Sequence, residues 1–301
     1  MQKGPPTPKG FRDILPDLAK KHREIINKIA DVLEKEGFVP LETPTIEFAE
    51  TLTGKYGEEE KLIYKFKDRG GRELALRYDL TVPLARFVAN NQQLIAKGPF
   101  RRYQIGQVFR GENPQHGRYR EFTQFDFDSV GSESLTEDAK IIAAVIKSID
   151  ALGVKDKTLF INDRKIFADI HPKYVSAIDK LEKIGRDGVL KELVEKGLPS
   201  EKAVDLFTKI EITKETDTVK SILDHLDKLG ASTSAVKFKP TLARGLNYYT
   251  GAIFELDVVG SQAGSVGGGG RYDNLIGSFA KKEIPAVGFS FGLDRLIETL
   301  E

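Results

Sequence analysis

Hydrophobic positions along the chain follow a helical period in some segments and a strand period in others. Residues 17–36 carry apolar side chains three or four positions apart and end at Gly37, which predicts an amphipathic helix. A similar stripe predicts a helix over residues 135–152. Near the end of the chain, an apolar run over residues 286–291 predicts a strand, followed by a helix that begins near Gly292.

Strand-type runs predict two hairpins. Residues 101–110 and 118–130 flank a loop at 111–117 that contains Gly, Asn and Pro, which are turn residues. Shorter runs over 63–66 and 73–77 flank a Gly-Gly turn. Each pair of runs is therefore expected to form an antiparallel pair of strands.

Proline and glycine limit which of the other extended segments can be central strands. Residues 38–48 contain Pro40 and Pro44, which exclude a central strand and favour an edge strand at a subunit contact. Residues 159–162 predict a short strand, and residues 264–270 predict a glycine-rich loop.

Together these elements predict an α+β fold, in which a largely antiparallel sheet has helices packed against it. Between about residues 164 and 234 the composition shifts to Lys, Glu, Asp and Leu with helical periodicity, which predicts a helical insertion. The core is then expected to consist of residues 1–163 and 235–301.

One face of the longer hairpin carries an ordered set of polar side chains. Because side chains alternate along a strand, one face from residue 118 onward should hold Arg118, Arg120, Phe122, Gln124, Asp126 and Asp128. This order, from basic through aromatic to acidic, fits a ligand with an anionic end, a planar middle and a cationic end. A solvated face with cross-strand ion pairs would give the same pattern, and periodicity alone leaves both interpretations open.

Composition narrows the function classes. The 301 residues include 46 basic and 45 acidic side chains, so no global field marks a nucleic-acid binder. No apolar run approaches the ~20 residues that cross a bilayer, and the start lacks a secretory h-region. The absence of Cys excludes disulfides, thiolate catalysis and Cys-based zinc sites. The four histidines lie far apart in the sequence. We expect a cytoplasmic protein without a membrane segment or a protein-held metal.

Four further stretches concentrate polar groups. In residues 77–81, Asp79 or Thr81 is expected to cap a helix, which is an alternative to a role in binding. Residues 244–251 place an Arg and two tyrosines among small residues, and the tyrosines alone could be structural. Residues 267–273 contain four consecutive glycines but neither a P-loop nor a dinucleotide fingerprint, so they suit close approach to a flat ligand, or a flexible turn.

The fourth stretch, residues 288–295, places Arg295 in the first turn of a helix. A cation there opposes the helix dipole, which favours an anionic partner such as phosphate. Together with Arg110, Arg118 and Arg244, this side chain would form a polyanion site. Such a set suits phosphoryl or nucleotidyl transfer, in which Arg and Mg²⁺ neutralise charge.

These stretches resemble the catalytic domain of histidyl-tRNA synthetase, a class II aminoacyl-tRNA synthetase, more the archaeal and eukaryotic type than the bacterial. GFVPLETPTIE resembles motif 1, FRGENPQHGRYREFTQFDFD motif 2 and AVGFSFGLDRL motif 3. LRYDLTVPLAR, RGLNYYTG and GGGRYD resemble further signatures of the family. The resemblance implies an ATP-dependent histidine–tRNA ligase that forms histidyl-adenylate, uses Mg²⁺, acts on the acceptor end of tRNA(His) and is a homodimer through motif 1.

The resemblance also assigns roles to residues. For ATP, it implies Arg110 at the α-phosphate, Glu112 on the adenine side, Arg118 at the outer phosphates, Phe122 stacked on adenine and Arg295 at the γ-phosphate. For histidine, it implies Asp79, Thr81 and Gln124 at the α-amino end, and Asp128, Tyr248 and Tyr249 at the imidazole. Arg244 would bridge the substrate carboxylate and the α-phosphate, so Arg110 and Arg244 are the implied catalytic residues.

Two departures from the family pattern qualify this expectation. Asn247 stands where the family usually has Asp, which removes a charge beside the pocket. The chain also ends at Glu301, where the family continues into an anticodon-binding domain of about a hundred residues, a normal domain size. The expectation is a truncated catalytic core. The alternative is a histidine-sensing paralogue that resembles the regulatory subunit of ATP phosphoribosyltransferase, but that paralogue tends to lose the arginines that are present here.

Overall fold

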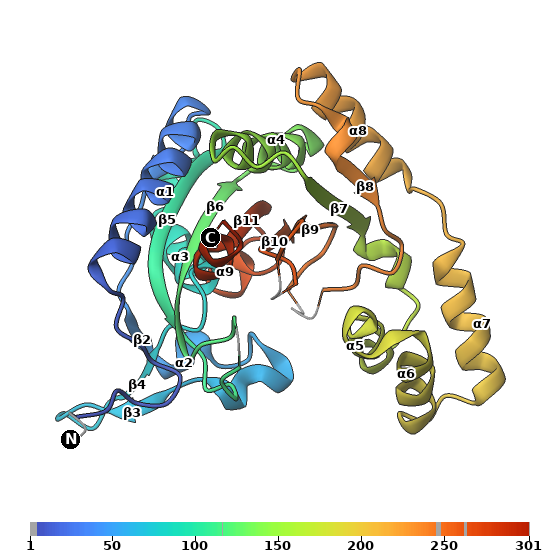
Figure 1. Cartoon of the computed structure of the whole chain (residues 1–301), viewed down its shortest axis with the longest axis horizontal. Helices are drawn as coiled ribbons and strands as arrows, with labels where there is room; N and C mark the ends of the chain where they lie inside the picture. Colours follow the sequence, from blue (N-terminus) through green and yellow to red (C-terminus); the bar gives the residue numbers. More distant parts are fainter. Residues whose placement is uncertain (1–4, 116, 245–247, 262–263, 301) are drawn as a thin grey trace.

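The computed structural model describes residues 5–115, 117–244, 248–261 and 264–300 (Figure 1). Its centre is an eight-stranded sheet whose two outermost pairs are parallel and whose inner pairs are antiparallel. The predicted α+β fold is confirmed. In sheet order the strands are β1 (Val39–Pro40), β5 (Phe100–Phe109), β6 (Glu121–Val130), β11 (Ala286–Gly292), β10 (Gly267–Arg271), β9 (Ala252–Val258), β7 (Lys157–Asp163) and β8 (Val236–Phe238).

A second, three-stranded sheet lies beside the N-terminal part of the large one. Its order is β2 (Ile46–Phe48), β4 (Glu73–Leu76) and β3 (Lys65–Lys67), and the antiparallel pairing of β3 with β4 confirms the shorter hairpin. Residues 38–48 therefore supply an edge strand to each sheet, as the prolines predicted. Their place at a subunit contact stays a prediction.

The helices begin and end close to their predicted limits. Those predicted at 17–36, 135–152 and after Gly292 are present as the first, fourth and ninth below. The α-helices are α1 (Pro16–Lys35), α2 (Ala49–Leu52), α3 (Thr81–Asn90), α4 (Leu135–Ala151), α5 (Pro172–Ile178), α6 (Leu181–Glu195), α7 (Ser200–Glu211), α8 (Asp217–Lys228) and α9 (Leu293–Thr299). Short 3₁₀ helices are η1 (Gly57–Leu62), η2 (Gln92–Ile95), η3 (Arg164–Phe167), η4 (Thr233–Ala235) and η5 (Ile276–Ser278).

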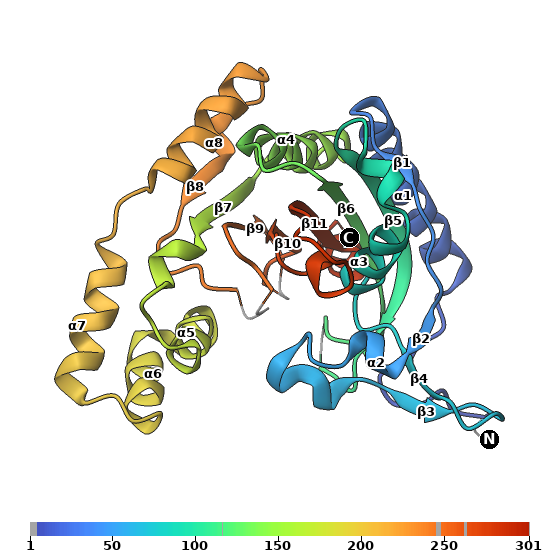
Figure 2. The same cartoon turned by 180° about the vertical axis from the view of Figure 1, so that it is seen from behind.

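The two faces of the large sheet have different partners. Figure 1 shows α1, α4 and α8 following one another around the outer side of the sheet, and Figure 2 shows the same arrangement from behind. Phe125 and Phe127 of β6 and Phe289 of β11 pack on that side in one core with α1, α4, α8 and α9. The opposite face packs in part against α2 and α3. The rest of that face is lined by polar residues of the strands.

The region predicted as a helical insertion contains two kinds of helix. Helices α5, α6 and α7 enclose an apolar cluster of their own, which includes Leu193 and Phe207. Helix α8 instead buries Ile222 and Leu226 in the main core, where it contacts α4. The division of the chain into core and insertion at 164–234 stays a prediction.

The glycine-rich loop predicted at 264–270 is wrong in its larger part. Residues 267–271 form β10, which lies between β9 and β11. Glycine is usually depleted in strands, but here neighbouring atoms occupy the side-chain positions. A Cβ atom at Gly269 would overlap the carbonyl oxygen of Gly288.

The longer hairpin is confirmed by full antiparallel pairing of β5 with β6. Its second strand, however, begins at residue 121 and not at 118, so the predicted alternation holds only from that point. Gln115 and Arg118 bridge each other and close the turn, and the Arg120 amide donates to the carbonyl oxygen of Gly10 at 2.9 Å. His116 lies outside the described residues.

Within the described part of the chain, no helix has both the length and the apolar content that a membrane span requires.

Candidate active site

The candidate site lies on the face of the large sheet that points away from α1 and α4. The strand residues on this face form its floor, and the strand register determines which of them are neighbours. Residues directly opposite one another across β5, β6, β11, β10 and β9 form rows. Glycines stand in these rows where side chains from elsewhere cross the floor. A Cβ atom at Gly288 would overlap the Asp128 carboxylate, and one at Gly268 would overlap the Arg244 guanidinium. The two central rows are Arg102, Asp128, Gly288, Gly270 and Ile253, and then Gln104, Asp126, Ser290, Gly268 and Glu255.

Buried carboxylates form one end of the site. Asp128 accepts a hydrogen bond from the Tyr272 hydroxyl and forms an ion pair with Arg102, whose Nη2 lies 2.7 Å from Asp128 Oδ2. Burial raises the pKa of Asp128, although the Arg102 charge works in the opposite direction. The neighbouring Asp126 is also buried, and burial raises its pKa to about 7.

Helix α3 brings a third carboxylate to this end. Asp79 stands just before the helix, and its Oδ1 accepts hydrogen bonds from Val82 N and from the Tyr56 hydroxyl, both at 3.0 Å. The N-cap position of α3 is Leu80, whose side chain cannot cap, so neither Asp79 nor Thr81 is the cap as predicted; Asp79, one residue earlier, instead reaches into the first turn through its bond from Val82 N. Thr81 opens the helix and is buried. Burial raises the pKa of Asp79.

Four buried oxygens at this end have no hydrogen-bond donor among the described residues: Asp79 Oδ2, Gln124 Oε1, Asp126 Oδ1 and Asp128 Oδ2. Asp128 Oδ2 is balanced by its ion pair with Arg102, so the first three are the ones open to a ligand. The amide nitrogen of Gln124 is already used, since it donates to Ser290 Oγ at 2.9 Å and fixes the orientation of the side chain. A buried acceptor without a donor is costly, so this end is built for a ligand rich in N–H groups.

Arginines form the other end. The Arg110 guanidinium lies 4.4 Å from the Tyr78 ring centre and 5.1 Å from that of Phe122, and its Nε donates to the Tyr78 carbonyl oxygen at 3.1 Å. Burial opposes the charge of Arg110, but Tyr78, Glu112 and Asp79 raise its pKa. The stacking leaves a charged, rigid group beside an aromatic ring.

Arg118 and Arg295 extend this positive end. Arg295 donates from Nε to the carbonyl oxygen of Gly117 at 3.1 Å and from Nη1 to that of Ser265 at 3.2 Å. Its pKa is lowered by burial first, and then by repulsion from Arg118 and Arg110. The Arg118 side chain is 43% exposed and lies 3.6 Å from Glu112. Guanidiniums that repel one another in this way form a site for a polyanion.

Arg244 lies between the two ends. Its Nη1 is 3.0 Å from Glu255 Oε2, and its guanidinium crosses the floor above Gly268. Its backbone has a φ of +52°, which is unusual for a residue other than glycine and is typical of strained functional positions. Burial opposes its charge, but Tyr249 and Glu255 raise the pKa of Arg244.

Two adjacent tyrosines close the carboxylate end. The rings of Tyr248 and Tyr249 lie 5.0 Å apart, and Tyr248 packs edge-on against Tyr272 at 6.0 Å. Tyr249 lies so close to β10 that a Cβ atom at Gly270 would be 2.9 Å from its ring. The preceding residues of this signature, including Asn247, lie outside the described residues.

The structure brings the predicted site residues to one face of the large sheet, while their individual roles stay predictions. The face assignment placed Asp126 beside Asp128 without giving it a role, and sequence reasoning did not select five side chains that complete the site: Tyr56, Arg102, Glu255, Tyr272 and Ser290. Continuing the face assignment from one strand of the hairpin to the other would have placed Arg102 opposite Asp128. Glu255 and Ser290 lie on β9 and β11, Tyr272 directly follows β10, and Tyr56 precedes η1, so their neighbours depend on the strand order and on long-range packing.

No group of three or more His, Cys, Asp or Glu side chains within the described ranges could hold a metal ion.

A family model, a curated relative and a solved structure all match this chain and point to the same family. The family model for histidyl-tRNA synthetase matches residues 10–187 and 173–296. A histidine–tRNA ligase from Aeropyrum pernix is 43% identical over 98% of this chain and 74% of its own length. The crystal structure of histidyl-tRNA synthetase from Nostoc sp. PCC 7120 superposes with a TM-score of 0.83 at 31% identity, covering 99% of this chain and 76% of that one.

A second solved structure is described as an ATP phosphoribosyltransferase regulatory subunit/histidyl-tRNA synthetase from Bacillus halodurans C. It superposes with a TM-score of 0.82 at 25% identity and covers 98% of this chain and 83% of that one.

Proposed function

The chain belongs to the histidyl-tRNA synthetase family, and from this premise we propose that it activates L-histidine with ATP and transfers the histidyl group to tRNA(His). The observation that carries the proposal is the contrast between the two ends of one floor. Buried acceptor oxygens without donors stand at one end, and mutually repelling guanidiniums at the other. Histidyl-adenylate likewise has N–H groups at its amino-acid end and a phosphate group beyond them.

The first reaction is attack of the histidine carboxylate on the α-phosphate of ATP, with release of pyrophosphate. The carboxylate is already an anion, so this step needs no general base. Arg244 crosses the floor above Gly268 and Arg110 stands at the arginine end, and both would neutralise charge that develops on the α-phosphate. Both guanidiniums are held by fixed partners, Tyr78 for the first and Glu255 for the second.

For ATP, we propose that Arg118 and Arg295 bind the outer phosphates, that Phe122 stacks on the adenine, and that Glu112 lies on the adenine side. The stacking of Arg110 on Phe122 supports this arrangement, because it places a cation beside an aromatic face. For histidine, Asp79, Thr81 and Gln124 would receive the ammonium group, and Asp128 with Tyr248 and Tyr249 the imidazole.

Mg²⁺ would arrive with the ATP phosphates. The carboxylates of Glu112 and Glu255 border the arginines, and oxygen donors of this kind fit Mg²⁺, which needs only one or two when substrate phosphates supply the rest. When bound, the ion would neutralise phosphate charge.

We also propose a homodimer in which residues 38–48 form the subunit contact. The exposed edge strands β1 and β2 support it, since Val39, Ile46 and Phe48 are all exposed. The acceptor end of tRNA(His) would enter at the open side of the site, and the cytoplasm is the compartment in which the product is used.

A non-catalytic histidine sensor is the alternative, because the structure from Bacillus halodurans C carries both names. Arg110, Arg118, Arg244 and Arg295 favour the enzyme, since a protein that only binds histidine has no need of a polyanion site.

The test is ATP–pyrophosphate exchange with each amino acid offered separately. The wild-type chain should exchange with histidine alone, and Arg244→Ala should lower that rate about a hundredfold, the effect of losing one charge-stabilising contact. Arg186→Ala, an exposed arginine on α6 that pairs with Glu211, is the control and should exchange at the wild-type rate. Histidine binding without any exchange would support the sensor and reject the enzyme.

A further inference from the structure

We propose that Arg271 and Asp273 are positioning residues for histidine recognition, and that they act through Thr250 on the segment that carries Tyr248 and Tyr249. The inference rests on the function proposed above and adds the residues that hold its amino-acid end in place.

The two tyrosines lie on a segment that has no regular secondary structure before β9. Thr250, the next residue, attaches this segment to the end of β10. Its amide donates to the Arg271 carbonyl oxygen at 2.8 Å, and its hydroxyl accepts from Asp273 N at 3.0 Å. The same hydroxyl lies 3.2 Å from Asp273 Oδ2, to which it can donate. Tyr248 and Tyr249 therefore lie within two residues of Thr250, whose backbone and side chain are both hydrogen-bonded to the end of β10.

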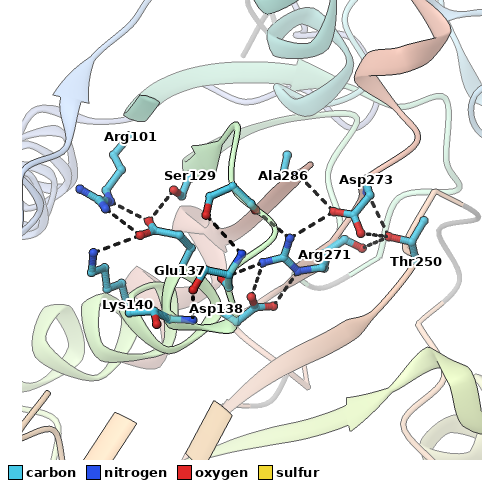
Figure 3. Close-up of polar contacts among 12 residues, drawn as sticks. Arg101, Ser129, Glu137, Asp138, Lys140, Thr250, Arg271, Asp273 and Ala286 are labelled. Carbon is cyan, nitrogen blue, oxygen red and sulfur yellow. Dashed lines mark hydrogen bonds and ion pairs between the residues drawn. The ribbon is translucent and has the colours of Figure 1, made fainter. Parts of the chain in front are cut away.

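The Arg271 side chain reaches the opposite face of the sheet. Figure 3 shows its guanidinium between Asp138 of α4 and Asp273. Arg271 Nε donates to Asp138 Oδ1 at 3.2 Å, Nη2 pairs with the second oxygen of the same carboxylate, and Nη1 lies 3.2 Å from Asp273 Oδ1. Asp138 is fully buried. The tyrosine segment is thus tied to the main helix of the core.

Asp273 has a second attachment. Its Oδ1 accepts a hydrogen bond from Ala286 N at 3.3 Å, at the first residue of β11. The segment also passes closely over the arginine, because a Cβ atom at Gly251 would lie 3.2 Å from Arg271 Cδ. The segment around Thr250 and Gly251 is therefore held both by the ion pair of Arg271 with Asp273 and by close packing on the Arg271 side chain.

Among the described residues, the chain neighbours of Arg271 contact proposed histidine-binding residues. Gly270 leaves room for the Tyr249 ring, and Tyr272 packs on Tyr248 while it donates to Asp128. The phosphate arginines have other supports, such as Tyr78 for Arg110 and the carbonyl oxygens of Gly117 and Ser265 for Arg295. Loosening the Thr250 attachment should weaken histidine binding and leave ATP binding intact.

The same helix provides a matched control. Glu137 precedes Asp138, is nearly as buried, and pairs with Arg101 at 2.7 Å and with Ser129 at 2.6 Å (Figure 3). This network joins α4 to β5 and β6 and does not include the tyrosine segment. A substitution in the Glu137 network therefore measures the effect of losing a buried polar contact on stability and KM while the segment with Tyr248 and Tyr249 stays in place.

The experiment compares Thr250→Val, Thr250→Ser and Ser129→Ala by ATP–pyrophosphate exchange. Thr250→Val removes the hydroxyl and keeps the side-chain volume, so the KM for histidine should rise about tenfold while the KM for ATP stays within about twofold of wild type. Thr250→Ser should restore the wild-type KM. Ser129→Ala should lower the unfolding midpoint and leave both KM values unchanged. Arg271→Ala is not suitable, because it would leave buried Asp138 without its cation and is expected to unfold the chain.

The outcomes separate the two proposals. If the wild-type chain exchanges with histidine but Thr250→Val raises both KM values equally, or neither, the positioning role is rejected. If the wild-type chain does not exchange with any amino acid, the proposed function fails and the positioning role fails with it.

Discussion

The two ends of the site hold their charged groups in opposite ways. At the carboxylate end, Asp126 and Asp128 are only 2% and 3% exposed, and their neighbours are fixed by the strand register. At the arginine end, the Arg118 side chain is 43% exposed, and Arg295 is bonded to carbonyl oxygens of loops. The carboxylate end is therefore dry and rigid, whereas the arginine end is positively charged and only partly buried.

This difference bears on specificity. A buried acceptor without a donor penalises any ligand that lacks an N–H group in the same place, so the dry end can reject similar amino acids strongly. Guanidiniums attract phosphate through charge-assisted hydrogen bonds, whichever molecule carries the phosphate. We infer that the carboxylate end selects the amino acid, whereas the arginine end supplies affinity for ATP and stabilises the reaction.

The largest effect is expected from removing charge at the arginine end. Arg110→Ala should lower the rate of histidine-dependent pyrophosphate exchange by about 10²–10³, because a preorganised charge next to the reacting phosphate is lost. Histidine affinity, measured by calorimetry, should stay within about twofold of wild type. Arg110→Lys keeps the charge without the planar stacking on Tyr78 and should give an intermediate rate. If Arg110→Ala lowered histidine affinity as much as it lowers the exchange rate, the two ends would not act separately.

A smaller effect is expected from removing charge at the carboxylate end. In Asp79→Asn, Oδ1 can still accept from Tyr56 and Val82, so the fold should be kept. The free Oδ2 becomes an amide, which cannot accept from an ammonium group. Histidine affinity should therefore fall about tenfold to a hundredfold, with the KM for ATP unchanged. Asp68→Asn, in the exposed turn of the β3–β4 hairpin, is the control and should change neither value.

The smallest effect concerns stability and its pH dependence. The folded pKa of Asp126, about 7, lies above the ordinary value near 3.8 because of burial. Between these values the native state keeps a proton that the unfolded chain has released. The resulting stabilisation is fully present below pH ~4 and is lost as the pH rises to ~7, with a slope of at most about 1.4 kcal/mol per unit.

Asp126→Asn removes this titration. The variant should therefore gain stability relative to wild type between pH 5 and pH 8, as measured by urea unfolding at both values. The same difference in unfolding free energy at pH 5 and pH 8 would show that Asp126 is not held protonated by burial.

Local patterns predicted the parts of the site that lie on one hairpin. The alternation from Phe122 to Asp128 placed the ring, the amide and the carboxylates on one face, and the pairing of β5 with β6 confirms it. Arg295 was found because a cation in the first turn of a helix is locally unfavourable. The leaning toward the archaeal and eukaryotic type of the family stays a prediction.

Other parts depend on long-range order and could not be predicted locally. The sequence predicts a loop at β10 because glycine has low strand propensity, whereas Gly268 and Gly270 leave room for the side chains of Arg244 and Tyr249, and Gly269 for the Gly288 carbonyl oxygen. Ser290 supports Gln124 only because β11 lies next to β6, although the two strands are far apart in the sequence. Such neighbours follow from the strand order, which periodicity does not determine.

The most direct test of the two-ended account is a crossed titration at equilibrium. Histidine and ATP would each be titrated separately into wild type, Arg110→Ala and Asp79→Asn by calorimetry. Arg110→Ala should weaken ATP binding and keep histidine binding, whereas Asp79→Asn should weaken histidine binding and keep ATP binding. If each variant weakens the binding of both ligands by the same factor, the carboxylate end and the arginine end are not separate binding sites.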